Sequence, residues 1–213
     1  MTQERDAPEG TAPEGMQDFA AEAAPSDIAP PIAAPAHRAG LLGRLDRLDH
    51  SLTERILVKA PLDGRPKRWV VVLRRFSEAG SYGVGWIVLF AVVGIVSDGL
   101  LRGAVAAALV VGMLLFNTGI KGIFKRPRPL QRAIEHAPAS YSMPSAHTSM
   151  AMVGAATMHV IVPDFAAAWW GIAIALGISR VMLGMHFLGD VLAGALLGLA
   201  VGLLVAAPLV AAI

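Results

Sequence analysis

The feature of this sequence that most restricts its fold is the scarcity of charge after Glu78. Five apolar stretches, separated by short polar segments, fill this part of the chain: 80–97, 103–120, 145–162, 165–183 and 187–208. A membrane-spanning helix needs about 20 mostly apolar residues, within a range of roughly 17–25. Charged residues make up 16% of the chain, against about 25% in soluble domains. We therefore expect an all-α fold, a polytopic membrane helical bundle of about five spans, or of six if residues 56–76 contain a further crossing.

Two segments of different charge precede this predicted membrane domain, which we place at residues 79–213. Residues 1–36 contain seven acidic residues, one arginine and six prolines. Such a composition buries too little apolar surface to offset the entropy lost on folding. It predicts a disordered, acidic, Pro/Ala-rich tail.

The second segment, residues 37–78, is basic, with ten Arg or Lys residues against five Asp or Glu. Within it, aliphatic residues recur every three or four positions, which is the spacing of one helix face. They are Leu41, Leu45, Leu48, Leu52 and Ile56. Two interpretations of this amphipathic helix remain open. The apolar face packs on the protein's own core, or it lies at the membrane surface with its basic residues near anionic headgroups.

Polar residues of the membrane domain gather in three clusters, at residues 121–129, 144–147 and 179–190. Each cluster lies at the end of a predicted span. The chain crosses the membrane and returns between the second and third clusters, so all three lie on the same side. Because ionisable groups near membrane depth are costly, their concentration at one end of the bundle predicts a functional site.

The three clusters supply groups that suit a phosphate. Lys121, Arg128 and Arg180 provide three cations with few acidic residues nearby. An arginine matches phosphate oxygens with two parallel hydrogen bonds. Ser145 and Ala146 open a predicted helix, where unpaired N–H groups and the helix dipole favour an anion. The sequence therefore predicts an oxyanion-binding site.

Two histidines accompany these cations. His186 and Asp190 are four residues apart, which places them on the same face if both belong to a helix. Asp190 can then hold a proton on one ring nitrogen and leave the other to attack phosphorus, forming a phosphohistidine. His147 is the candidate general acid for the leaving alkoxide and then the base for water. Because the cations stabilise the oxyanion charge, this chemistry requires no metal and no other cofactor.

The spacing of these residues forms a three-part signature: Lys121, six residues, Arg128-Pro129; Pro144-Ser145-Ala146-His147; Ser179-Arg180, five residues, His186, three residues, Asp190. It resembles that of the type-2 phosphatidic-acid phosphatase family, which is related to vanadium haloperoxidases, over residues 79–205. Ala146 replaces the glycine of the family's second motif. Alanine keeps the backbone N–H that would contact phosphate, so we expect activity to be retained.

The resemblance implies a helical-bundle membrane phosphatase that acts on lipid phosphates without a metal. It implies that Lys121, Arg128, Ser145, Ala146 and Arg180 bind phosphate. It also implies that His147 is the acid, that His186 is the nucleophile and that Asp190 is its partner.

The function expected from these residues is hydrolysis of a lipid phosphate. Candidate substrates are decaprenylphosphoryl-phosphoribose phosphate, undecaprenyl pyrophosphate, phosphatidylglycerophosphate and phosphatidic acid. Two alternatives use the same residues: a vanadate-dependent peroxidase-like enzyme, and a lipid-binding or scaffold protein with a relic site. The expected partners are the lipid substrate and the bilayer. A net charge of +2 is too small to indicate nucleic acid, and no pattern indicates an oligomeric state.

The distribution of basic residues predicts the orientation. With five spans, Arg102 is the one Arg or Lys of 18 on the side opposite the clusters. Basic residues concentrate in cytoplasmic segments. We therefore expect an integral protein of a bacterial-type inner membrane with its active site facing the cytoplasm. Members of the family commonly have six spans and an active site outside the cytoplasm, so this expectation departs from the family pattern.

Several polar residues near the clusters have more ordinary interpretations. Lys125, Arg126 and Arg132 suit charges at the membrane edge better than ligands. Asn117 either orients Lys121 or makes a hydrogen bond between helices. Glycines inside the predicted spans suit close helix packing. They are Gly94, Gly112, Gly154, Gly171, Gly194 and Gly198.

Overall fold

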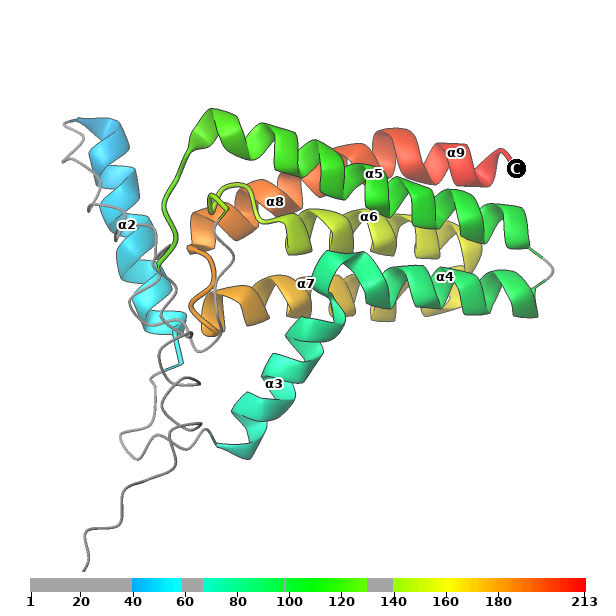
Figure 1. Cartoon of the computed structure of the whole chain (residues 1–213), viewed down its shortest axis with the longest axis horizontal. Coiled ribbons are helices and arrows are strands. Elements are labelled where there is room, and N and C mark those ends of the chain that lie inside the picture. The colour runs from blue at the N-terminus through cyan, green and yellow to red at the C-terminus, as the bar shows by residue number, and fades with distance from the viewer. Residues whose placement is uncertain (1–39, 59–66, 98, 130–139) are drawn as a thin grey trace, which may run out of the picture. The chain divides into compact units, whose positions relative to one another are not determined.

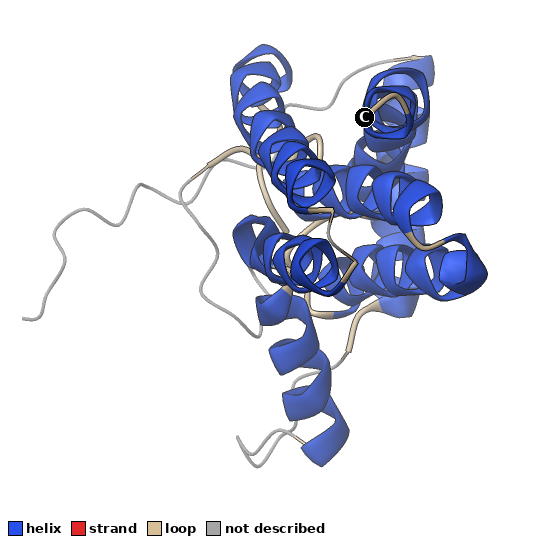
Figure 2. Cartoon of the chain, turned by 90° about the vertical axis from the view of Figure 1, so that its right-hand side faces the viewer, coloured by secondary structure: helices blue, strands red, loops and turns tan. Residues whose placement is uncertain are grey.

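A computed structural model describes residues 40–58, 67–97, 99–129 and 140–213. Every regular element in these residues is helical (Figure 2). The helices are α2 (Leu41–Ile56), α3 (Arg68–Ala79), α4 (Val84–Val96), α5 (Leu100–Phe124), α6 (Ala146–Ile161), α7 (Ala166–Met182), α8 (Leu188–Val201) and α9 (Ala207–Ala211). A π-helical turn, Gly202–Ala206, joins α8 to α9. The expected all-α membrane bundle is confirmed, while the predicted tail and Arg132 lie outside the described residues.

Helix α6 is the centre of the bundle. Its residues 148–158 are all buried, and it packs against α5, α7, α8 and α9. A helix that is apolar on every side belongs in an interior, because it has no face to offer to water. Phe90 of α4, Met113 of α5 and Met150 of α6 are among the largest fully buried side chains. Helices α4 to α9 run alongside one another around this core (Figure 1).

Within the described residues, three helices are long and apolar enough to cross a membrane: α5, α8 with its continuation to Ala211, and α7 with the short turn at Pro163–Phe165 before it. Helices α3 and α4 meet the same test only as a pair, bent by 65°. Helix α6 has 16 residues and falls short of this length. The five predicted spans thus correspond to helices α4 to α9, but the number of spans stays a prediction.

Glycines bring several of these helices into close contact. A Cβ atom at Gly194 of α8 would lie 2.5 Å from the carbonyl oxygen of Ser145, and one at Gly198 would lie 2.4 Å from that of Ser149. Gly154 and Gly94 are likewise packed against neighbours. The expectation is wrong for Gly112 and Gly171, which have no such neighbour within 4 Å.

The amphipathic helix is present as α2, but its apolar face does not pack on the core. Leu41, Leu48 and Leu52 are 71%, 59% and 43% exposed. The polar side of α2 contacts the bundle instead, through Asp49 and Thr53 at the start of α8. The interpretation that the leucine face packs on the protein's own core is therefore wrong.

Four helix ends meet at one end of the bundle, on the left of Figure 1. They are the C-terminal ends of α5 and α7 and the N-terminal ends of α6 and α8. Helix α2 crosses this same end. The three polar clusters lie at these helix ends, as the alternation of spans requires.

Candidate active site

The first cluster begins on α5 and continues into the loop that follows it. Helix α5 extends to Phe124, so Lys121 lies in its last turn, with only 8% of its surface exposed. Lys125 ends the helix in the left-handed region at φ 46° and turns the chain toward the bundle. Arg128 follows in the loop and is also buried. Two of the expected cations are thus enclosed at the same helix end.

The second cluster starts α6. Ser145 has an extended backbone before the helix, and Ala146 is its first residue. The Ser145 N–H donates to the carbonyl oxygen of Asp190 at 2.9 Å, which ties α6 to α8. The Ser145 hydroxyl accepts a hydrogen bond from Thr148 at 3.1 Å. The N-terminus of α6 is therefore fixed next to the third cluster, as the oxyanion site requires.

The third cluster spans the turn between α7 and α8. Gly184 adopts φ 73°, a left-handed conformation that only glycine takes readily. The turn places His186 before the first residue of α8, with Asp190 inside that helix. The expectation that both lie on one helical face is therefore wrong. They still meet, because His186 Nδ1 lies 3.6 Å from Asp190 Oδ2.

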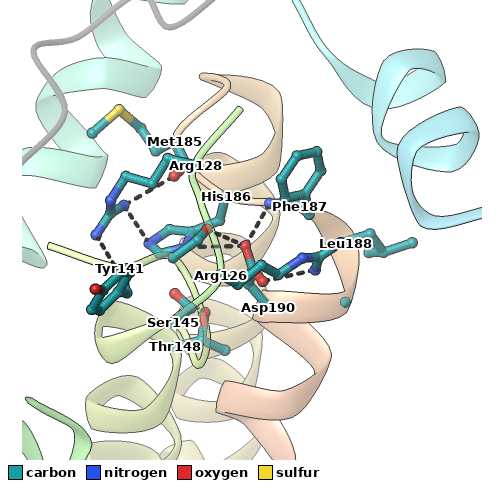
Figure 3. Close-up of polar contacts among 12 residues, drawn as sticks. Arg126, Arg128, Tyr141, Ser145, Thr148, Met185, His186, Phe187, Leu188 and Asp190 are labelled. Atoms are coloured by element: carbon teal, nitrogen blue, oxygen red, sulfur yellow. Dashed lines mark hydrogen bonds and ion pairs between the residues drawn. The ribbon is translucent and has the colours of Figure 1, made fainter. Parts of the chain in front are cut away.

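Arg128 and His186 are in direct contact (Figure 3). Arg128 Nη1 lies 3.2 Å from His186 Nε2, and the same guanidinium donates to the carbonyl oxygens of Ser140 and Met185. A guanidinium can only donate, so Nε2 must accept. The neutral ring then carries its proton on Nδ1, which faces Ser142 Oγ at 3.3 Å and Asp190.

Burial governs the charge of this histidine. His186 is 1% exposed, and its burial lowers its pKa from 6.5 to about 4. The charge of Arg128 acts in the same direction, whereas Asp190 opposes it. Burial together with the charge of Arg180 also lowers the pKa of Arg128, to about 10. Near pH 7 His186 is therefore neutral while Arg128 remains a cation.

Arg180 and His147 complete the group of predicted residues. Arg180 lies in the last turn of α7, is 3% exposed, and donates from Nη1 to the Ser77 hydroxyl of α3. His147, in the first turn of α6, interacts electrostatically with Arg180, His186, Arg128 and Lys121. Lys121 interacts in the same way with Arg128, Arg180 and Asp190. All eight predicted site residues are thus gathered at one end of the bundle.

The sequence did not identify two further residues of this site, Ser142 and Arg126. The buried Ser142 hydroxyl donates to Asp190 Oδ2 and contacts His186. Arg126, expected to be a charge at the membrane edge, instead contacts Asp190 at 2.8 Å. Both lie in the long loop between α5 and α6, where no periodic pattern indicates which side chains face inward.

Arg126 retains its charge in this environment. Burial works against the charge, but Asp190 and Asp49 outweigh it and raise the pKa of Arg126.

Of the two alternatives for Asn117, the structure shows the hydrogen bond between helices. Its Nδ2 donates to Ser149 of α6 at 3.1 Å.

Residues 101–210 match the PAP2 superfamily. The chain belongs to this superfamily. It is 30% identical over 169 residues to the decaprenylphosphoryl-5-phosphoribose phosphatase of Mycobacterium tuberculosis, covering 70% of this chain and 85% of that protein. The family and its relatives make the chain a lipid phosphatase. Its long apolar helices and its likeness to membrane phosphatases of known structure make it an integral membrane protein.

Two solved structures share this fold. One is a transmembrane PAP2-type phosphatidylglycerolphosphate phosphatase from Bacillus subtilis, with a TM-score of 0.60 and 26% identity over 76% of this chain and 84% of that one. The other is LpxE from Aquifex aeolicus, with a TM-score of 0.61 and 23% identity over 74% and 93%. At 23% identity, the similarity to LpxE shows a shared fold alone.

Proposed function

We propose that this lipid phosphatase removes a terminal phosphate from a polyprenyl-linked phosphosugar, through a covalent phosphohistidine. The substrate class rests on the 30% identity to the decaprenylphosphoryl-5-phosphoribose phosphatase, which extends over 169 residues. The mechanism rests on one observation. His186 is buried and neutral, with its Nδ1 proton directed at Ser142 and Asp190, so Nε2 carries the lone pair that can attack once Arg128 moves away.

In the first step Nε2 attacks phosphorus, and the bond from phosphorus to the ester oxygen breaks. His147 gives its proton to the leaving alkoxide. Asp190 stabilises the positive charge that develops on the ring of His186. In the second step His147 takes a proton from water, and the oxygen of this water attacks phosphorus. The P–N bond then breaks, and inorganic phosphate and free His186 result.

Lys121, Arg128 and Arg180 stabilise the charge on the three non-bridging oxygens during both steps. The N-terminus of α6 adds the backbone N–H of Ala146. Arg128 must leave Nε2 before the attack, and an incoming dianionic phosphate supplies the attraction that draws it away.

Phosphate release by the purified protein in EDTA tests this proposal. The panel holds the decaprenyl phosphosugar, undecaprenyl pyrophosphate, phosphatidylglycerophosphate and phosphatidic acid. We expect His186→Ala to lower release by at least about 10³-fold. A matched control is His159→Ala, at the far end of α6, where the ring contacts Trp170. Equal release by wild type and His186→Ala would overturn the mechanism, and a preference for a glycerolipid would overturn the substrate class.

We also propose that the site faces the cytoplasm across a bacterial inner membrane. Arg102 lies at the end of α5 opposite Lys121, and it is the one basic residue of 18 expected on that side. The chain contains no cysteine, so a maleimide can react only with a cysteine that has been introduced. An impermeant maleimide should label Arg102→Cys in intact cells and spare Lys125→Cys. The reverse pattern would overturn this orientation.

A further inference from the structure

Arg126 is surrounded by three carboxylates. Its Nη1 donates to Asp190 Oδ1 at 2.8 Å, and its Nη2 donates to Asp46 Oδ1 at 2.9 Å. Nη2 also lies 2.7 Å from Asp49 Oδ2. The guanidinium carbon lies 4.4 Å from the centre of the Phe187 ring, a distance that suits a cation–π contact. Ion pairs and ring together fix the guanidinium in one orientation.

The two oxygens of Asp190 have separate partners (Figure 3). Oδ1 contacts Arg126, while Oδ2 accepts the Phe187 N–H at 2.9 Å and the Ser142 hydroxyl. Oδ2 is also the oxygen nearest to His186 Nδ1. The ion pair to Arg126 thus holds one oxygen of the carboxylate whose other oxygen faces the nucleophile.

Helix α2 holds this arrangement from outside the bundle. Besides contacting Arg126, Asp49 accepts the Gly189 N–H at 2.7 Å, and Thr53 accepts the Leu188 N–H at 3.0 Å. The first N–H groups of a helix have no partners within it. Helix α2 therefore caps α8, the helix that carries Asp190, and anchors Arg126 at the same point.

We propose that Arg126 is a positioning residue, which holds Asp190 in the orientation that His186 requires, and that α2 is needed for catalysis because Asp46 and Asp49 hold Arg126. The inference rests on the proposed function of His186. Three carboxylates compensate the charge of Arg126, so it acts on Asp190 and does not bind the substrate phosphate. Outer residues that orient a catalytic group typically affect activity about 10–100-fold.

The test compares Arg126→Gln, Arg126→Lys and the control Lys125→Gln, which removes the same charge from the exposed neighbouring residue. We expect Arg126→Gln to lower kcat by about 10–100-fold and to leave KM and the inhibition constant of vanadate unchanged. Arg126→Lys should restore part of kcat, because an ammonium group reaches one carboxylate but cannot bridge several. Lys125→Gln should behave as wild type.

Two results would overturn the proposal. A rise in KM and in the vanadate inhibition constant with normal kcat would make Arg126 a phosphate ligand. An unchanged kcat in Arg126→Gln would remove any positioning role.

If Arg126→Gln does not fold, the double variant Asp46→Asn with Asp49→Asn tests whether α2 must hold Arg126, since it removes two carboxylates and leaves Arg126 and Asp190 unchanged. It should lower kcat at unchanged KM, and a normal kcat would contradict the role of α2. His186→Ala, assayed alongside, separates failure of this proposal from failure of the histidine mechanism. If His186→Ala retains activity, the mechanism itself is wrong.

A second inference rests on the leucine face of α2, defined by Leu41, Leu45, Leu48, Leu52 and Ile56, all of which are exposed. At about 100° per residue, this face lies about 80° around the helix from the side that holds Asp49 and Thr53. The exposed Arg44, Arg47 and Arg55 border it on the other side. The geometry points to an anionic bilayer surface as the occupant, with leucines in the lipid and arginines at the headgroups.

Single spin labels test this placement in the full chain, reconstituted in nanodiscs that contain anionic lipid. A label at Leu48→Cys should collide with oxygen more than with a water-soluble nickel chelate, and one at Arg47→Cys should do the reverse. Equal access of nickel to both labels would overturn the proposal. Protection of the Leu48 label from both reagents would also overturn it, because a second copy of the chain would then cover the face.

Discussion

Arg128 donates a hydrogen bond to the Nε2 atom of His186 across 3.2 Å. The cation proposed to bind the phosphate is thus hydrogen-bonded to the atom proposed to attack phosphorus. Its other bonds, to the carbonyl oxygens of Ser140 and Met185, keep the guanidinium close to the phosphate position. The contact also fixes the ring proton on Nδ1, which is the tautomer a nucleophile needs.

The first prediction concerns Arg128→Lys. A lysine supplies a point charge but not the planar set of donors that satisfies phosphate oxygens and nearby carbonyls together. We expect kcat/KM to fall by about 10²–10³-fold, with weaker inhibition by vanadate. Steady-state kinetics measure both quantities. Unchanged vanadate inhibition would contradict a role of Arg128 in binding phosphate.

The second prediction concerns Ser142, which joins Asp190 to the ring of His186. A hydrogen bond to a charged group contributes about 1.5–3 kcal/mol, so Ser142→Ala should lower kcat by about 10–100-fold. Ser97→Ala is the matched control, because Ser97 is exposed and its hydroxyl donates to the carbonyl oxygen of Val93 in the same helix. A normal rate in Ser142→Ala would show that Asp190 orients the ring without it.

The third prediction concerns the charge of His186. Burial lowers its pKa to about 4, so a proton blocks Nε2 only as the pH falls through about 4, and the ring stays neutral at pH 6.5. Titration of ring-labelled histidines by NMR measures this directly, with His186→Gln to assign the signal. A His186 signal that titrates near pH 6.5 would contradict the buried, neutral nucleophile.

The fourth prediction compares two glycines. A Cβ atom at Gly194 would meet the backbone of Ser145 at 2.5 Å, so Gly194→Ala should separate α8 from the start of α6. Overpacking of this kind costs about 1–3 kcal/mol, which should lower both Tm and kcat. Gly112 has no such neighbour within 4 Å, and Gly112→Ala should stabilise α5 by up to about 1 kcal/mol. Thermal unfolding in detergent tests both. Equal Tm changes in the two variants would contradict the close contact.

The sequence predicted well what local patterns determine. Apolar length marked the long helices, and spacing placed Lys121, Arg128 and His186 at the same end of the bundle. The sequence-based prediction failed where a loop brings the contacting residues together. His186 lies before α8 because Gly184 turns the chain there. In the sequence, Arg126 resembles a charge at the membrane edge. In the fold, α2 and α8, which are distant in sequence, bring Asp49 and Asp190 into contact with it. Contacts between residues that are far apart in sequence produce no periodic pattern in the sequence.

The leucine face of α2 illustrates a similar ambiguity. Its spacing predicts a helix whether the partner is a protein core or a bilayer. The contacts of Asp49 and Thr53 with α8 show that the polar side faces the protein. The apolar stripe alone could not distinguish these two arrangements.

The proposed mechanism requires a covalent phosphohistidine at His186, which rapid quenching can detect. Wild-type protein is mixed with a lipid substrate labelled in its terminal phosphate, quenched in alkali within one turnover, and digested for mass spectrometry. We expect label on His186 that is absent in His186→Ala and that is lost as free phosphate appears. Phosphate release at the wild-type rate from His186→Ala, with no labelled protein at any time, would contradict it.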